Sequence, residues 1–255
     1  MMAVATLARH TLLDALRERV FRLLFAFLIV LMAAAHLVKP LALGEGRRVT
    51  IDLGLTVLSL SGLLLIVMLG TRLLQKEVEH RTMLLLLARP VHRWQVLLGK
   101  FCGLLGVVGL VTIGMLAILA AVMWLAGYPV GSPLWAAGYF AFLELGILCA
   151  WSLLLTAFTS SALSGFFLIG LFVAGHLAPS LIETAALLPS AWARLLLTGT
   201  FRLLPRFDLY NRSLEVVHGL PAGAAETLWA TVYALLYAAA ALLMAYLLFR
   251  HREFS

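Results

Sequence analysis

The side chains that could do chemistry in this 255-residue chain are few and widely spaced. Glu144 is the most unusual, because it stands near the middle of a long apolar run, where a charged carboxyl is costly inside a membrane. His36 and His176 also lie within apolar runs. Glu144 and His176 could together line a pathway for protons or substrate, but Glu144 could instead make a structural hydrogen bond between helices. We treat Glu144 and His176 as pathway candidates.

These residues do not form the patterns of a catalytic or cofactor site. A serine protease would need Ser164 beside His176, but the two lie in one apolar run, about 18 Å apart at ~1.5 Å per helical residue. A phosphate-binding loop needs G-x-x-x-x-G-K-[ST], and the Gly-Lys pair at Gly99 is followed by phenylalanine. Neither His36 nor His176 has a second ligand three or four residues away. We predict no catalytic, cofactor-binding or metal site in this chain.

The elements that position these residues are predicted to be membrane-spanning helices. Hydrophobic residues make up 63% of the chain and charged residues 12%, against roughly one half and one quarter in a soluble domain. The apolar residues form blocks near the ~20 residues that a spanning helix needs, without the alternation of a membrane barrel. We predict an all-α, polytopic single domain over residues 1–255, with six spans: Val20–Val38, Leu53–Gly70, Leu104–Ala126, Leu134–Phe158, Ala162–Ile182 and Leu228–Phe249.

The distribution of basic residues predicts the orientation of these spans. With the N-terminus inside, twelve of the 19 lysines and arginines fall in cytoplasmic segments. The positive-inside rule then places both termini in the cytoplasm. The net charge of +7 is a topology signal and an attraction to anionic lipid headgroups, so we do not expect a nucleic-acid partner.

Two segments outside the spans are also predicted to contact the membrane or its outer face. Apolar residues at helical spacing in residues 1–19 predict an amphipathic elbow helix that lies in the inner interface and leads into the first span. Between the last two spans, Glu183–Thr227 begins as an amphipathic or re-entrant helix ending near Pro205. The rest, Arg206–Gly223, is polar and turn-rich. The whole segment is expected to be an outer cap, either a lid or a contact for a periplasmic partner.

The segment between the second and third spans, residues 71–103, is the most informative. Met83–Ala88 is a run of six apolar residues between charged flanks. It is too short to cross a membrane, and an exposed apolar patch usually marks an interaction surface. Arg89–Pro90 then breaks the helix, and a new helix from Val91 continues into the third span. A partner protein would cover the apolar run, unless its helix simply rests on lipid.

The same segment resembles the membrane subunits of type-2 ABC transporters. The elbow helix, the six spans, the long last outer loop and the basic C-terminus agree with that family. The compact form, without a fused ATPase, is most similar to the NosY-like branch, which includes a transporter subunit for copper-site maturation in nitrous oxide reductase. This chain has no Met- or His-rich copper pathway, so copper is not carried over. The residues that carry the resemblance are Glu77, Glu79, Arg81, Thr82, Leu84–Leu87, Arg89, Pro90, Val91, Arg93, Gly99 and Lys100.

The resemblance implies that Arg81–Trp94 includes a coupling helix inserted into a groove of a separate ATPase subunit, which would hold ATP and magnesium. Thr159–Ser164 would form a second, smaller contact. It also implies an exporter of the bacterial inner membrane, in which two ATPase subunits serve two copies of this chain or one copy and a close homologue. The residues expected to dock the ATPase are Glu77, Arg81, Thr82, Met83, Leu84, Leu87, Arg89, Pro90, His92, Arg93 and Trp94.

We therefore predict the permease subunit of an ATP-driven exporter, which is not an enzyme by itself. The alternative is a membrane scaffold or assembly factor that recruits an ATPase without transport. A membrane enzyme acting on lipid is a third hypothesis. Lipids, glycolipids, peptides and small hydrophobic molecules fit the sequence equally well as substrates.

Overall fold

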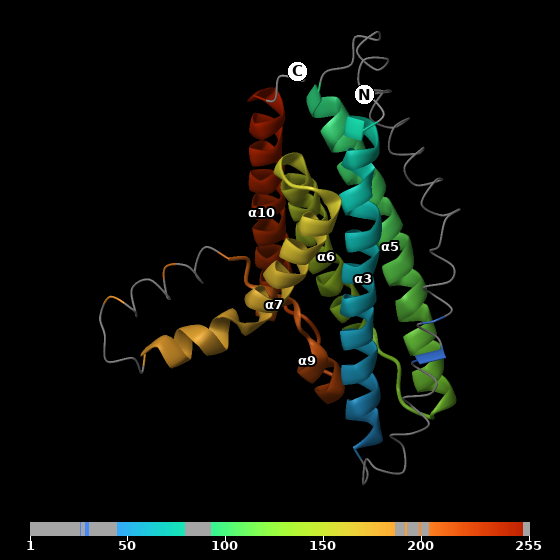
Figure 1. Cartoon of the computed structure of the whole chain (residues 1–255). Coiled ribbons are helices and arrows are strands. Elements are labelled where there is room, and N and C mark those ends of the chain that lie inside the picture. Colours follow the sequence, from blue (N-terminus) through green and yellow to red (C-terminus); the bar gives the residue numbers. More distant parts are fainter. Residues whose placement is uncertain are drawn as a thin grey trace.

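The protein is seen in a computed structural model that describes residues 26, 29–30, 45–79, 93–186, 192, 199 and 204–251. The described part is helical, as predicted, and Figure 1 shows its long helices gathered in one bundle. The long helices are α3 (Gly46–Glu79), α5 (Arg93–Leu125), α6 (Ser132–Phe158), α7 (Ser161–Ala186) and α10 (Ala224–His251). Between α7 and α10 lie a short 3-10 helix, η1 (Phe207–Tyr210), and the short helix α9 (Ser213–His218).

The five long helices are each long and apolar enough to cross a membrane, which confirms five of the six predicted spans. The remaining span, Val20–Val38, lies almost wholly outside the described residues, and the elbow helix in residues 1–19 lies outside them entirely. The spanning portions are Gly46–Thr71, Trp94–Leu125, Ser132–Phe158, Ser161–Glu183 and Ala224–Leu248.

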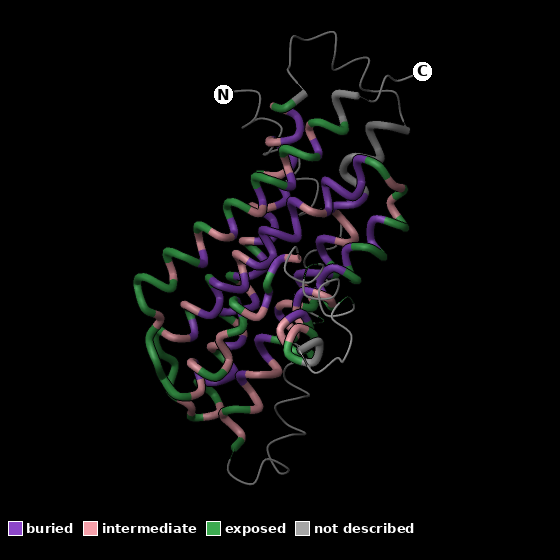
Figure 2. Tube along the Cα trace, turned by 90° about the vertical axis from the view of Figure 1, so that its left-hand side faces the viewer, coloured by how far each residue is buried: buried purple, intermediate pink, exposed green. Residues whose placement is uncertain are grey.

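Helix α6 is the centre of the bundle and packs against α3, α5, α7 and α10. In its most apolar stretch 78% of the residues are buried, against 28% for α10, and Figure 2 shows the buried residues along the inside of the bundle. Small residues allow helices to approach closely in lipid. A Cβ added at Gly62 of α3 would meet Leu145 of α6, and one added at Gly138 of α6 would meet Leu116 of α5. Glycine at these positions lets both neighbours pack directly on α6.

The end of α3 and the start of α5 lie at the same end of the bundle (Figure 1), where α6 also turns into α7. Helix α3 continues beyond its membrane-spanning part to Glu79, and α5 is helical from Arg93. The helix predicted to start at Val91 and to continue into the third span is described from Arg93. Residues 80–92 lie outside the described residues, so the coupling helix stays a prediction.

The connection between α7 and α10 lies toward the opposite end and differs from its predicted form. Pro179 lies inside α7, and Figure 1 shows the last part of this helix turned away from the bundle, as expected near a proline that removes a backbone hydrogen bond. Arg206–Gly223 is only partly a polar cap, because Phe207 and Tyr210 are buried in the main hydrophobic core. The predicted re-entrant helix up to Pro205 lies mostly outside the described residues.

Candidate functional site

Glu144 occupies the middle of α6 and is buried inside the bundle, as the sequence predicted. Its side chain is only 3% exposed. The hydroxyl of Ser59, on α3, donates a hydrogen bond to the carboxyl group. Among the described residues, the carboxylate oxygen Oε1 has no hydrogen-bond partner. A buried polar atom without a hydrogen bond costs about 1–3 kcal/mol, so the surroundings of Oε1 bear on what the site can bind.

The structure brings His176 of α7 next to Glu144. Its Nε2 atom lies 3.5 Å from Oε1 of Glu144, and its Nδ1 atom lies 3.1 Å from the carbonyl oxygen of Phe172. The imidazole ring stacks on Phe172 with 4.4 Å between ring centroids and faces Phe207 at 5.6 Å. The histidine is therefore held by its own helix and by η1, and its Nε2 atom faces the acid. Ser164, by contrast, lies apart and pairs with Thr159.

The pairing of Glu144 with His176 follows from the short turn between α6 and α7. Glu144 stands fourteen residues before the end of α6 at Phe158, and His176 stands fifteen residues after the start of α7 at Ser161. Two antiparallel helices joined by a two-residue link place such positions at nearly the same depth, since each residue rises about 1.5 Å. The proximity of Glu144 and His176 thus follows from two helices that are consecutive in the sequence.

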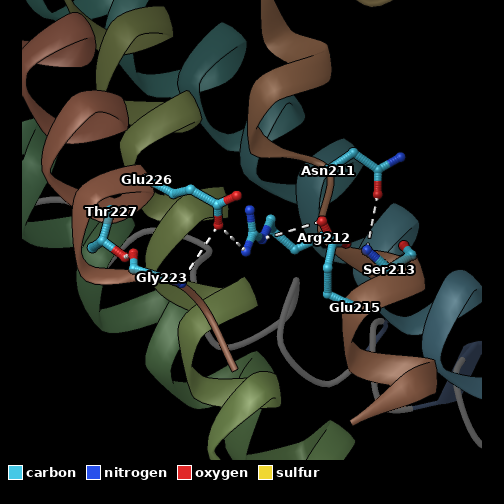
Figure 3. A network of polar contacts seen from close by, with 7 residues as sticks. All are labelled: Asn211, Arg212, Ser213, Glu215, Gly223, Glu226 and Thr227. Carbon is cyan, nitrogen blue, oxygen red and sulfur yellow. Dashed lines mark hydrogen bonds and ion pairs between the residues drawn. The ribbon is translucent and has the colours of Figure 1, made fainter. Parts of the chain in front are cut away.

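Arg212, just before α9, approaches the same site from the outer segment. Its guanidinium group lies over the Phe140 ring, 4.7 Å from the centroid, and its side chain is only 12% exposed. It donates a hydrogen bond of 2.9 Å to Glu226 at the start of α10 and lies 3.5 Å from Glu215 of α9. Figure 3 shows Glu226 bridging Arg212 and the backbone of Gly223. These contacts tie α9 to the beginning of α10.

Tyr210 of η1 completes the inner wall of this region. Its hydroxyl donates a hydrogen bond of 3.1 Å to the carbonyl oxygen of Ala230 in α10, and its ring approaches Phe140. Burial raises the pKa of Tyr210 above its ordinary value, and the neighbouring Tyr233 and Glu144 add to this. Tyr210 therefore stays protonated and holds η1 against α6 and α10.

Together these residues enclose a cavity of about 160 Å³. Sequence reasoning found its acid and its histidine but missed Ser59, Tyr210 and Arg212. The aromatic residues Phe207 and Tyr210, three positions apart, and the later Val216 were the available signal that this segment packs inward. The lining residues are Leu55, Thr56, Ser59, Leu60, Ala137, Ala141, Glu144, Phe172, His176, Tyr210, Asn211, Arg212 and Ser213.

Three of the predicted ATPase-docking residues fall within the described helices. Glu77 belongs to the last turn of α3, and Arg93 and Trp94 open α5. The Trp94 side chain is exposed, as a docking residue requires. The remaining docking residues, from Arg81 to His92, lie outside the described residues.

A family model described as "ABC-2 family transporter protein" matches residues 5–254, which is nearly the whole chain. The chain belongs to the ABC-2 transporter family. No curated protein matches the sequence. The family match confirms the resemblance at the level of the family, although it does not distinguish the NosY-like branch.

Membership of the ABC-2 family determines what kind of component this is. ABC-2 membrane subunits are multi-pass membrane proteins without catalytic activity, and a separate ABC ATPase subunit hydrolyses ATP. Such a permease implies no cofactor in its own chain. The described residues contain no group of three or more histidine, cysteine or acidic side chains that could hold a metal ion.

A cluster of hydroxyl groups joins two spans of this ABC-2 subunit at the end where the docking residues lie. The Ser161 hydroxyl, at the start of α7, donates a 3.0 Å hydrogen bond to the hydroxyl of Thr71 in α3. Thr71 in turn donates to the carbonyl oxygen of Val67. Beside them, the hydroxyls of Thr159 and Ser164 lie 2.6 Å apart. The start of α7 is thus hydrogen-bonded to the part of α3 that precedes residues 80–92.

Proposed function

We propose that the chain is the permease subunit of an ATP-driven exporter in the bacterial inner membrane, in the compact, NosY-like branch of its family. In this proposal it works as two copies, or as one copy with a close homologue, together with two ATPase subunits. Both termini are cytoplasmic. ATP binding closes the ATPase pair, and the resulting motion reaches the spans through the coupling helix.

The observation that carries this proposal is the placement of the two helices that flank the docking segment. Helix α3 ends at Glu79 and α5 begins at Arg93 at one end of the bundle. The thirteen residues between them contain the apolar run Met83–Ala88. An exposed apolar run usually marks an interaction surface, and ABC-2 permeases pair with ABC ATPase subunits.

The hydroxyl cluster supports a route for the motion. A displacement of the coupling segment pulls first on the end of α3, and the Ser161–Thr71 hydrogen bond joins that end to α7. Helix α7 carries His176, and it packs on α6, which carries Glu144. The proposed pathway residues therefore lie on helices that this motion reaches.

The test is ATP turnover by the ATPase subunit co-expressed and co-purified with this chain. We expect Trp94→Ala to lower the stimulated turnover, because this exposed side chain stands beside the docking segment. The matched control is Trp124→Ala, which removes an exposed tryptophan from the opposite end of the same helix. Arg89→Glu should abolish the stimulation.

The scaffold hypothesis makes a different prediction for the same complex. It expects stable binding of the ATPase with no stimulation of turnover by the unchanged chain. That result, or equal turnover in the Trp94→Ala and Trp124→Ala variants, would contradict the permease proposal.

A further inference from the structure

The cavity beside Glu144 contains a carboxylate oxygen that the described part of the fold leaves without a donor. Oε1 of Glu144 has no hydrogen-bond partner there, although it is almost fully buried. The separation of 3.5 Å from Nε2 of His176 exceeds the 2.7–3.2 Å typical of N–H···O hydrogen bonds. Buried acceptors are normally satisfied by protein, water or a bound group. The cavity therefore supplies an acceptor with room in front of it.

His176 is not free to close this gap. Its Nδ1 atom lies near the carbonyl oxygen of Phe172, and its ring contacts both Phe172 and Phe207, which also contact each other. Moving the ring toward Glu144 would disturb these contacts. The distance between the acid and the histidine is thus set by packing.

Arg212 is the one arginine or lysine among the cavity-lining residues, and it is already engaged. Glu226 accepts its hydrogen bond, Glu215 lies within ion-pair distance, and its guanidinium group rests on Phe140. Two acids thus balance one base at the outer edge of the cavity. Glu144 is the single acid among the cavity-lining residues, and His176, 3.5 Å away, is the basic group next to it.

The size and lining of the cavity restrict the group that could pair with Glu144. A volume of about 160 Å³ is close to the ~150 Å³ that accommodates benzene in an engineered protein cavity. The walls combine apolar side chains, such as Leu55 and Ala141, with the hydroxyls of Thr56 and Ser59. Glu144 is the single acid among the lining residues, and the described residues hold no group of three or more histidine, cysteine or acidic side chains that could bind a metal ion. The acid also disfavours an anion.

We propose that this cavity binds an ammonium group bearing at least one N–H donor and a short apolar substituent, with Glu144 as its counter-ion. Thr56 and Leu60 line the cavity and are exposed at the surface of α3, so the cavity reaches the outside of the described bundle. The ammonium could belong to a soluble amine or to an amine-bearing lipid headgroup. The inference deepens the proposed function by naming a substrate or ligand class for its pathway residues, but binding itself needs no ATPase.

The test uses the full chain, purified in nanodiscs of phosphatidylcholine and phosphatidylglycerol, which lack N–H donors on nitrogen. The thermal unfolding midpoint is followed by tryptophan fluorescence during titration with ethylammonium chloride. Tetramethylammonium chloride at equal ionic strength is the chemical control, since it has the charge but no N–H. We expect a saturable rise in the midpoint with ethylammonium alone.

Substitutions then assign the effect to the cavity. Glu144→Gln should weaken the apparent affinity about tenfold or more, because a charge-assisted hydrogen bond is lost. Glu183→Gln, which changes an exposed acid at the end of α7's spanning part, should leave it unchanged. Ala141→Leu fills the cavity without touching the acid and should also abolish binding. The Ala141→Leu variant still tests the proposal if Glu144→Gln does not fold.

The lipid source is distinguished by replacing part of the phosphatidylcholine with phosphatidylethanolamine. If a headgroup occupies the site, this lipid alone stabilises the parent chain but not Ala141→Leu, and added ethylammonium has little further effect. If the ligand is soluble, only ethylammonium acts. The proposal is overturned if neither amine source stabilises the parent chain, if tetramethylammonium acts equally, or if Glu144→Gln and Ala141→Leu both bind as tightly as the parent. Failure here would leave the ATPase-coupling proposal untouched.

Discussion

The fit of η1 against α7 can be tested at one glycine. A Cβ at Gly175 would meet Cδ2 of Phe207 and would lie 2.8 Å from both Cε2 of that ring and the carbonyl oxygen of Pro205. Real Cβ atoms essentially never approach other heavy atoms this closely, and the Pro205 oxygen belongs to backbone that cannot simply rotate away. Gly175→Ala must therefore push η1 away from α7.

The matched control lies on the same helix. A Cβ at Gly170 meets nothing within 4 Å, so Gly170→Ala should give only the helix-propensity gain of about 1 kcal/mol. Gly175→Ala has the same gain, but overpacking costs about 1–3 kcal/mol. Because the propensity gain cancels in the comparison, the two variants should differ by about 1–3 kcal/mol in unfolding free energy, with Gly175→Ala the less stable.

The assay is reversible unfolding in mixed micelles titrated with sodium dodecyl sulfate, followed by the fluorescence of the six tryptophans. Equal stability of Gly170→Ala and Gly175→Ala, within about 0.5 kcal/mol, would refute the close seating of η1 on α7. It would also remove the Phe207 side of the pocket that holds His176.

Three further predictions concern the contacts around the cavity and the hydroxyl cluster. Tyr210→Phe should lower the unfolding free energy by about 1 kcal/mol at pH 7 through loss of its hydrogen bond to Ala230. Because the folded-state pKa of Tyr210 is raised above its ordinary value of 10.0, only the unfolded state loses this proton just above pH 10. Stability should thus decline as pH rises from there, less steeply in Tyr210→Phe than in the control Tyr128→Phe. Arg212→Lys keeps the charge but loses the planar contact with Phe140, so it should lower the unfolding free energy by about 1 kcal/mol. In double-mutant cycles with Glu226→Gln, the coupling energy between residues 212 and 226 should be smaller with lysine at position 212 than with arginine. Ser161→Ala removes the link to Thr71 and should lower stimulated ATP turnover while the ATPase still co-purifies; Ser160→Ala is the control, and equal turnover in the two variants would contradict the proposed route.

The membrane-spanning helices could be predicted from the sequence because a helix needs about 20 apolar residues to cross the hydrocarbon core. Five spans stand where the apolar blocks predicted them. The pairing of Glu144 with His176 was also within reach, since the two-residue link between α6 and α7 places both residues at one depth. The apolar run Met83–Ala88 pointed to a partner, and the family match supplies the class of that partner.

The outer side of the cavity was not readable in the same way. The connection between α7 and α10 is long, so sequence spacing does not determine where Arg212 lies. Its position depends on tertiary contacts with Phe140 and Glu226, which come from two other helices. Ser59 likewise reaches Glu144 only because α3 packs against α6. A single sequence does not show which face of α3 packs on α6.

The central claim is that the apolar run between α3 and α5 faces the cytoplasm and is covered by an ATPase subunit. It is tested by placing single cysteines at Leu84 and Leu87 in a Cys102→Ala background, with the fully buried Cys149 retained. A membrane-impermeant maleimide should label both from the cytoplasmic side of inverted vesicles, and the bound ATPase should block the labelling. Labelling only from the outer side, or labelling that the bound ATPase does not change, would contradict the account.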